Sequence, residues 1–256
     1  MYFFASDYDG TLYQDNIVTS KDRKIIQDFR SLGHQFGIAT GRHLHSILTE
    51  IDKYEIEIDF VIGNNGAAIL DASRKELYLA QIDKMIVNQV FDYVVNNLST
   101  EFYFFAVNNG YHYGQKSFVE IGAFDSGDRI TLDQAFNSEI ICAMFGQLLP
   151  DRNGVEIANH LNTVFKGLVQ AVPNGEFIDV VLPNDNKAMA ISRVLDSLDK
   201  KVNRVFTIGD SFNDIEMIKQ YDGFVIESGE PHLLALSNRV VKSVGDALEM
   251  VISKKM

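Results

Sequence analysis

Two carboxylates separated by one residue follow the first apolar segment of the chain, in Asp7-Tyr8-Asp9-Gly10-Thr11. The apolar segment, Tyr2 to Ser6, is expected to form a strand, and side chains two residues apart in an extended segment point the same way. Asp7 and Asp9 are therefore expected to face one substrate. In an open parallel sheet, ligands bind just beyond the carboxyl ends of the strands, which is where these acids lie.

A simple turn is the alternative explanation of this segment. Asp and Gly commonly leave a strand through a turn in which the Asp side chain bonds to nearby backbone. A calcium-binding EF-hand fits poorly, because its glycine belongs at the sixth loop position and a Glu at the twelfth. The other segments of the chain are needed to distinguish a simple turn from a ligand-binding site.

Two further segments could hold a phosphate group. A second expected strand, Phe36 to Ala39, ends in Thr40 and Gly41, and a hydroxyl and backbone N–H groups at such a turn can bind phosphate oxygens. A Thr at this place is also a common helix cap. Lys187 lies where a helix is expected to begin, and the helix dipole disfavours a cation there, so we expect an anionic partner. A solvated surface lysine is the alternative.

The fourth segment is Gly209-Asp210-Ser211-Phe212-Asn213-Asp214, which follows an expected strand from Arg204 to Ile208 and opens a helix. Asp210 and Asp214 are four residues apart and could approach one cation, while Asn213 could donate to a phosphate oxygen. An ordinary helix N-terminus rich in acids would explain the segment alone. All four segments nevertheless stand at strand-to-helix junctions, and this coincidence favours a site.

In this order the four segments resemble the haloacid dehalogenase superfamily of phosphohydrolases, specifically its Cof-type branch, which has a large cap inserted between the second and third motifs. The resemblance covers roughly residues 1 to 70 and 184 to 250. It implies that Asp7 is the nucleophile and Asp9 the acid/base. It also implies two sets of ligands: phosphate held by the Tyr8 backbone N–H, Thr40, Gly41, Lys187 and Asn213, and Mg²⁺ bound by Asp7, the carbonyl of Asp9 and Asp210, with Asp214 nearby in support.

Two departures from the family pattern are visible. Ala188 follows the lysine where relatives usually have Gly, and Glu227-Ser228-Gly229 replaces the more usual Met-Gly-Asn-Ala after the fifth strand. Neither departure removes a chemical group, but the second leaves the geometry of that loop open.

Apolar runs alternate with helical patterns at both ends of the chain, which predicts an α/β fold with a doubly wound parallel-sheet, Rossmann-like core. Further strands are expected at Phe60 to Gly63, Gly223 to Ile226 and Arg239 to Val241. One helix is expected to start with Ser20 as its cap and to end at Gly33, and another to run from Asn186 to Leu198.

The middle of the chain is richer in strands, which predicts an inserted α+β cap over residues 81–184, between core segments 1–80 and 185–256. Its expected helices run from Met85 to Leu98 and from Arg152 to Phe165. Its expected strands are Phe102 to Val107, Tyr111 to Gly114, Phe118 to Ala123, Ile140 to Phe145, Leu168 to Val172 and Phe177 to Leu182.

Polar and aromatic groups gather at one expected turn of this segment, at Asn108, Asn109, Tyr111, His112 and Tyr113. Their composition suits hydrogen bonding and stacking on a substrate. We therefore take Tyr111 and His112 as candidates for substrate specificity. An ordinary Asn-Gly hairpin with exposed aromatics is the alternative.

The composition limits the partners. A formal charge of -12 argues against nucleic acid or an anionic membrane as the main partner, because both require clustered Lys and Arg. Cys142 is the single cysteine, so no intramolecular disulfide can form. With no signal segment at the start and no apolar stretch of the roughly 20 residues that a membrane span needs, a cytoplasmic location is expected.

Together these observations predict a Mg²⁺-dependent phosphatase that acts on a small phosphorylated metabolite through an aspartyl-phosphate on Asp7. A phosphomutase, which returns the phosphoryl group to a sugar hydroxyl, would use the same motifs. A receiver-type signalling module also uses an Asp, Mg²⁺, a Thr and a Lys, but it needs neither a cap nor an acid/base at Asp9. The sequence selects neither the metabolite nor the oligomeric state.

Overall fold

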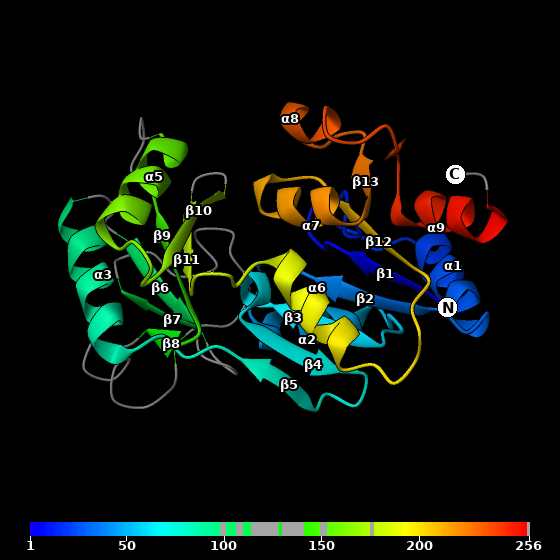
Figure 1. Ribbon diagram of the computed structural model, residues 1–256, viewed down its shortest axis with the longest axis horizontal. Helices are drawn as coiled ribbons and strands as arrows, with labels where there is room; N and C mark the ends of the chain where they lie inside the picture. Colours follow the sequence, from blue (N-terminus) through cyan, green and yellow to red (C-terminus); the bar gives the residue numbers. More distant parts are fainter. Residues whose placement is uncertain are drawn as a thin grey trace. The chain divides into compact units, whose positions relative to one another are not determined.

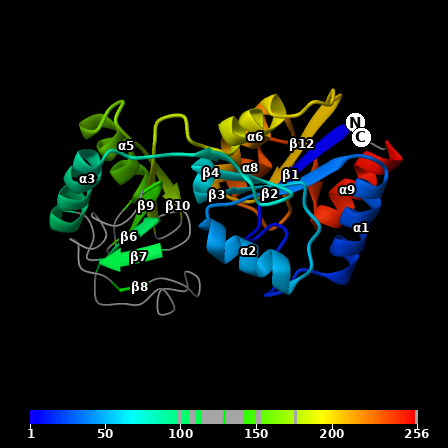
Figure 2. The same cartoon turned by 90° about the horizontal axis from the view of Figure 1, so that it is seen from below.

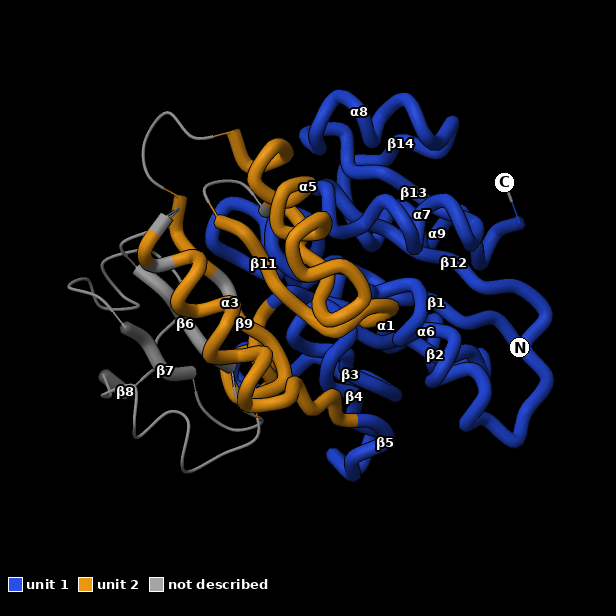
Figure 3. Tube along the Cα trace, turned by 60° about the vertical axis from the view of Figure 1, so that its left-hand side comes forward, with its two compact units in different colours: residues 1–41, 48–78, 186–256 blue, residues 42–47, 79–185 orange. Residues whose placement is uncertain are grey.

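The structure is a computed structural model that describes residues 1–97, 101–105, 110–113, 128–129, 141–148, 153–174 and 177–254. The chain divides into two compact units, which Figure 3 shows in different colours. The first contains residues 1–41, 48–78 and 186–256, and the second contains residues 42–47 and 79–185. In these described stretches, none of the helices has the length and apolar character to cross a membrane.

The first unit is built on an eight-stranded sheet with the strand order β14-β13-β12-β1-β2-β3-β4-β5. Neighbouring strands from β14 to β3 run parallel, and β4 pairs antiparallel with β3. The strands are β1 (Tyr2–Ser6), β2 (Gln35–Ala39), β3 (Phe60–Gly63), β4 (Ala68–Asp71), β5 (Glu76–Leu79), β12 (Arg204–Gly209), β13 (Asp222–Ile226) and β14 (Val240–Val241). The predicted α/β class with a parallel-sheet core is confirmed.

Helices cover both faces of this sheet, as Figures 1 and 2 show, with α1, α2 and α9 on one side and α6 on the other. The helical elements are α1 (Ser20–Ser31), α2 (Leu44–Lys53), α6 (Lys187–Asp196), α7 (Ile215–Gln220), α8 (Pro231–Leu234), α9 (Val244–Ser253) and the short 3-10 turns η1 (Asn64–Gly66) and η2 (Phe212–Asp214). This covering explains why the central strands are apolar on both faces.

The side-chain alternation of β1 divides the core between these two layers. Phe3 and Ala5 belong to a buried cluster with Ile191 of α6 and Met217 of α7. Phe4 points the other way and meets the ring of Phe29 on α1 edge to face, with centroids 6.1 Å apart. The same strand is thus fixed from both sides, which holds the residues after Ser6 at a defined position.

The cap of α1 differs from the prediction. Thr19, not Ser20, is the N-cap: its side chain accepts a hydrogen bond from the backbone N–H of Asp22, and Ser20 is the first helical residue. Either hydroxyl is a suitable cap, so the sequence alone favoured the wrong one of two neighbours. The helix ends before Gly33, which has the left-handed φ of 81° expected of a glycine after a helix.

The second unit carries a six-stranded sheet with the order β10-β11-β9-β6-β7-β8. Its helices α3 (Lys84–Asn97) and α5 (Gly154–Val164) share a buried apolar cluster with β9, β10 and β11. The strands are β6 (Glu101–Phe105), β7 (Gly110–Tyr113), β8 (Asp128–Arg129), β9 (Ala143–Gln147), β10 (Gln170–Asn174) and β11 (Phe177–Val181). The predicted strand Phe118 to Ala123 lies outside the described residues.

Candidate active site

Three strands of the first unit end side by side. Ser6, the last residue of β1, pairs with Ile208 of β12 and with Ile38 of β2. Asp7 follows directly, and its backbone N–H donates to the Ile208 carbonyl oxygen at 3.0 Å. The segments around Asp7, Thr40 and Asp210 therefore leave the sheet at one edge, as expected for a parallel sheet.

Lys187 joins two of the predicted carboxylates. Its Nζ lies 2.6 Å from Oδ1 of Asp7 and 2.6 Å from Oδ1 of Asp214. All three side chains are buried, and Lys187 is only 1% exposed. The prediction that this lysine has an anionic partner is confirmed, and the alternative of a solvated surface lysine is wrong. The Asn186 side chain caps α6 by accepting a hydrogen bond from the backbone N–H of Met189. This cap fixes the start of the helix, whose first residue is Lys187.

Asp214 is held by the protein through both of its oxygens. Oδ1 accepts from Lys187, and Oδ2 accepts from the backbone N–H groups of Asp210 at 3.0 Å and Ser211 at 3.1 Å. A Cβ placed at Gly209 would lie 2.3 Å from the Asp214 carboxyl carbon, so only glycine fits there. These contacts suit Asp214 to positioning the lysine and the 210–214 loop.

The side chain of Asp210 is held by the segment from Asp7 to Thr11. The Thr11 hydroxyl donates to Asp210 Oδ1 at 2.6 Å. Gly10 has a φ of 76°, and a Cβ on it would lie 2.4 Å from Asp210 Oδ2. Sequence reasoning missed the role of Thr11, which is 1% exposed. The sequence did contain a signal for this role, because the Thr11 hydroxyl lies in the same short segment as the carboxylates of Asp7 and Asp9.

Carboxylate oxygens of Asp7, Asp210 and Asp214 lie within 4.8 Å of one another. Burial raises the pKa of Asp7 well above its ordinary value, and the nearby Asp214 and Asp210 raise it further, against the effect of Lys187. Burial likewise raises the pKa of Asp210 to about 6, although the Thr11 hydrogen bond opposes this. Burial would lower the pKa of Lys187, but Asp214 and Asp7 outweigh it and raise that pKa, so the lysine stays charged.

This donor set fits a divalent cation. One lysine faces three carboxylates, so negative charge remains in a buried place, and a cation would offset it. Carboxylate oxygens are the ligands that Mg²⁺ prefers. The carboxylate of Asp9 is outside this group among the residues described, and the binding of metal by its backbone carbonyl stays a prediction.

The predicted phosphate-binding residues surround the same strand ends. Tyr8 is buried, and its hydroxyl donates to Glu50 of α2 at 2.9 Å, which fixes the segment that carries its backbone N–H. Thr40 is also buried. Asn213 Nδ2 donates at 3.0 Å to Oδ1 of Asn65, beside Gly41. Asn65 was not among the residues singled out in the sequence.

A family model for haloacid dehalogenase-like hydrolases matches residues 4–247. The chain is a haloacid dehalogenase-like hydrolase. The resemblance inferred from the sequence is thereby confirmed.

The curated relatives of this hydrolase include two proteins described as 5-amino-6-(5-phospho-D-ribitylamino)uracil phosphatases. The one from Bacillus subtilis is 28% identical, over 84% of this chain and 79% of its own. The one from Escherichia coli is 22% identical, over 84% of this chain and 81% of its own. A solved sugar phosphatase of haloacid dehalogenase subclass IIB shares the fold, with a TM-score of 0.81 and 18% identity, over 100% of this chain and 98% of its own.

The structure also shows the loop in which the hydrolase departs from the family pattern, Glu227-Ser228-Gly229. A Cβ on Gly229 would lie 3.1 Å from the Asp210 backbone, so the glycine permits close packing. The backbone N–H of Glu230 donates to the Asp210 carbonyl oxygen at 2.8 Å. The altered loop therefore supports the segment that carries Asp210.

The candidate specificity residues of the hydrolase lie in the second unit. Tyr111 and His112 belong to β7 and pair with Phe104 and Tyr103 of β6. Asn108 and Asn109 lie outside the described residues. The role of Tyr111 and His112 in specificity stays a prediction.

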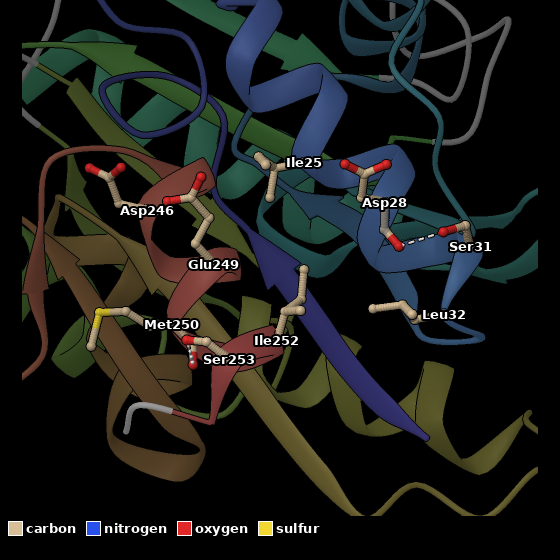
Figure 4. A pocket seen from close by; sticks show the side chains of 9 residues that line it. All are labelled: Ile25, Asp28, Ser31, Leu32, Asp246, Glu249, Met250, Ile252 and Ser253. Carbon is tan, nitrogen blue, oxygen red and sulfur yellow. Dashed lines mark hydrogen bonds between the residues drawn. The ribbon is translucent and has the colours of Figure 1, made fainter.

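A groove of about 800 Å³ between α1 and α9 is a separate feature of the hydrolase. Figure 4 shows its lining side chains, which include Ile25, Leu32 and Met250 with Asp28 and Glu249. None of the candidate catalytic, phosphate-binding or metal-binding residues lines it. This groove is therefore distinct from the candidate site at the strand ends.

The raised pKa of Asp210 gives a prediction for the metal-free hydrolase. In the folded state Asp210 has a pKa of about 6, above its ordinary value, so the folded protein keeps this proton at a higher pH than the unfolded chain does. Ionising Asp210 above this pH therefore destabilises the fold. Asp210→Asn should therefore increase the free energy of unfolding in chelator at about pH 7.5, by about 1–3 kcal/mol. The difference should shrink as the pH falls from about 6 towards 4, where the folded parent is protonated too.

Urea unfolding in chelator across this pH range measures the difference. Excess Mg²⁺ is the control, because the parent should then gain stability that the variant does not. A variant no more stable than the parent at about pH 7.5 would contradict the raised pKa.

Proposed function

We propose that this hydrolase is a Mg²⁺-dependent phosphatase that acts on a small phosphorylated metabolite through an aspartyl-phosphate on Asp7. The observation that carries the proposal is the buried contact of Asp7 with Lys187, with Asp210 and Asp214 within 4.8 Å at the same strand ends. A nucleophilic carboxylate, a fixed cation and a set of metal-ligating oxygens are the groups that phosphoryl transfer to an enzyme requires.

The metal would be held by the carboxylates of Asp7 and Asp210 and by the backbone carbonyl of Asp9. When bound, it would supply positive charge that offsets the repulsion between these carboxylates and a phosphate dianion. Asp214 would contribute by orienting Lys187 and the 210–214 loop, because both of its oxygens already accept hydrogen bonds.

In the first step, an oxygen of Asp7 forms a bond to phosphorus as the bond between phosphorus and the ester oxygen breaks. Protonated Asp9 gives its proton to the departing oxygen, which leaves as an alcohol. In the second step, Asp9 removes a proton from water, whose oxygen attacks phosphorus and restores the Asp7 carboxylate. Inorganic phosphate is the product.

Phosphate would be held by Lys187, the Asn213 amide, the Thr40 hydroxyl and the backbone N–H groups of Tyr8 and Gly41. Donors that are fixed before the substrate arrives stabilise charge without reorganising during the reaction. The buried Thr40 and the two hydrogen bonds of the Asn213 side chain support this role.

Residues 81–184 are proposed to act as a cap that recognises the group attached to the phosphate, with Tyr111 and His112 among the contacts. The two relatives named above act on a phosphorylated ribityl compound, so we propose a small phosphomonoester of this kind or a sugar phosphate as substrate.

Phosphate release from a panel of phosphorylated metabolites tests the function. The panel should include sugar phosphates, nucleotides, flavin and pyridoxal phosphates and the ribityl compound. Release should require Mg²⁺, stop in excess chelator and return when Mg²⁺ is restored. Full activity in chelator would remove the metal from the proposal, and an isomerised sugar phosphate without free phosphate would favour a phosphomutase.

Asp9→Asn tests the acid/base role. The amide cannot transfer a proton, but the backbone carbonyl proposed as a metal ligand is kept, so metal binding should survive. We expect the rate of turnover to fall about 10²–10⁴-fold, the usual contribution of one acid/base group. An aryl phosphate with a good leaving group should lose less in the first step, because that leaving group needs no proton. If the rate of the first step, measured under single-turnover conditions, fell equally for poor and good leaving groups, this would contradict protonation of the leaving group by Asp9.

A further inference from the structure

We propose that Asn65 is a positioning residue of this active site, which orients the Asn213 amide and fixes the neighbouring Thr40–Gly41 turn. This inference rests on the proposed function, in which Asn213, Thr40 and Gly41 bind phosphate. Asn65 lies in η1, after β3, and belongs to none of the four sequence motifs.

Both ends of the Asn213 amide are held. The Ser211 hydroxyl donates to Asn213 Oδ1 at 2.7 Å, and Asn213 Nδ2 donates to Asn65 Oδ1 at 3.0 Å. An amide held by one donor and one acceptor cannot flip without losing both hydrogen bonds. One of the two Nδ2 hydrogens of Asn213 is donated to Asn65. The other hydrogen lies in the same amide plane and points in a different, fixed direction, in which it could donate to a substrate oxygen.

The same residue fixes the end of β2. The backbone N–H of Asn65 donates to the Thr40 carbonyl oxygen at 3.0 Å. A Cβ placed on Gly41 would lie 3.2 Å from Asn65 Oδ1 and 3.6 Å from Asn213 Nδ2. Asn65 thus lies among three proposed phosphate-binding residues, although Asn213 is 148 residues away in the sequence.

The backbone around Asn65 is unusual and buried. Asn64, Asn65 and Gly66 have φ values of 51°, 54° and 105°, and Asn65 is 8% exposed. This left-handed region is uncommon for residues other than glycine, although Asn tolerates it better than most. A Cβ on Gly66 would lie 2.5 Å from the Asn186 carbonyl oxygen, so the turn is also packed against the start of α6. Such strained turns persist where the surroundings determine them, and they are concentrated at functional sites.

Asn65→Gly is the informative variant, because glycine adopts the same backbone conformation and only the side chain is removed. Asn213→Ala should lower kcat/KM about 10²–10³-fold, as expected for the loss of one positioned donor. Asn65→Gly should lower kcat/KM about tenfold or more, since the Asn213 amide remains but is no longer oriented.

The double variant Asn65→Gly/Asn213→Ala separates positioning from a structural role. If Asn65 acts through Asn213, the double variant should match Asn213→Ala to within about twofold. If Asn65 only supports the fold, the two losses should multiply. Asn16→Gly is the matched control: Asn16 is exposed, has a φ of 63° and lies outside the proposed site, so kcat/KM should not change.

A second readout does not depend on turnover. In protein with ¹⁵N-labelled asparagine, the Nδ2 signals of Asn213 are identified by their absence in Asn213→Ala. In the parent, one of the two Nδ2 protons should have the shift of a hydrogen-bonded amide. Asn65→Gly should move both protons to the positions of a free side-chain amide, and Asn16→Gly should leave them unchanged.

The outcomes distinguish the two proposals. If no metabolite or aryl phosphate releases phosphate but the Asn213 signals move in Asn65→Gly, the proposed function fails and the orienting contact stands. If phosphate is released but the signals stay in place, or the two losses multiply, the positioning role of Asn65 is overturned.

Discussion

Replacing Asp7 by Asn should abolish phosphate release and leave the fold intact. An amide is a far weaker nucleophile than a carboxylate and a poorer ligand for Mg²⁺, so both the covalent step and the metal site are lost. The shape is kept, and the amide oxygen of the variant can still accept from Lys187, whose Nζ lies 2.6 Å from the Asp7 oxygen. Burial and the neighbouring carboxylates already disfavour ionised Asp7, so the neutral amide should not destabilise the metal-free protein.

Single-turnover phosphate release, with enzyme in excess over substrate, measures this effect, and urea unfolding checks the fold. Asp28→Asn on α1 is a suitable control, because its carboxylate pairs with Lys24 at 2.8 Å, away from the proposed site. Activity in the Asp7 variant above about a few per cent of the parent would rule out Asp7 as the nucleophile.

Lys187→Met should cause the largest loss of stability among these variants. The change removes the cation shared by Asp7 and Asp214 and leaves two buried carboxylates unpaired. Breaking a buried pair by removing one partner typically costs about 3–5 kcal/mol. Turnover should also be lost, because Lys187 is a proposed phosphate-binding group.

Urea unfolding of Lys187→Met in chelator and in Mg²⁺ checks this prediction. Mg²⁺ should restore part of the stability, because a divalent cation can neutralise the same carboxylates. The loss should also be smaller at lower pH, because protonating Asp7, whose pKa burial already raises, removes the repulsion.

Lys21→Met provides the comparison for this variant, since Lys21 makes an exposed ion pair with Asp246 and should cost about 1 kcal/mol or less. A loss at Lys187 as small as that at Lys21 would show that the buried pair does not hold the site together.

The sequence was sufficient to predict the residues that leave the ends of parallel strands. Asp7, Thr40 and Asp210 follow short apolar strands, and parallel strands bring such residues to one edge regardless of their separation in the chain. Lys187 could be assigned an anionic partner because of its place at a helix start. These predictions depend on strand ends and helix starts, which apolar patterns locate well.

Other features could not be read from local patterns. Asn64 and Asn65 adopt left-handed conformations, and the Asn65 side chain contacts Asn213, which is 148 positions away in the sequence. The β4 strand is a four-residue strand that runs antiparallel to β3, and a run so short predicts no particular partner. The contact of Thr11 with Asp210 joins residues 199 positions apart, so it was visible only in the fold.

The measurement that tests the central claim most directly is detection of the phosphoryl group on Asp7 itself. The parent would be mixed with Mg²⁺ and its best substrate, quenched in acid during turnover and digested, and the peptide that contains Asp7 analysed by mass spectrometry. We expect this peptide to gain one phosphoryl group that hydroxylamine removes, and the Asp7→Asn protein to gain none. Turnover without any phosphoryl peptide, or with the label on a different residue, would contradict the aspartyl-phosphate mechanism.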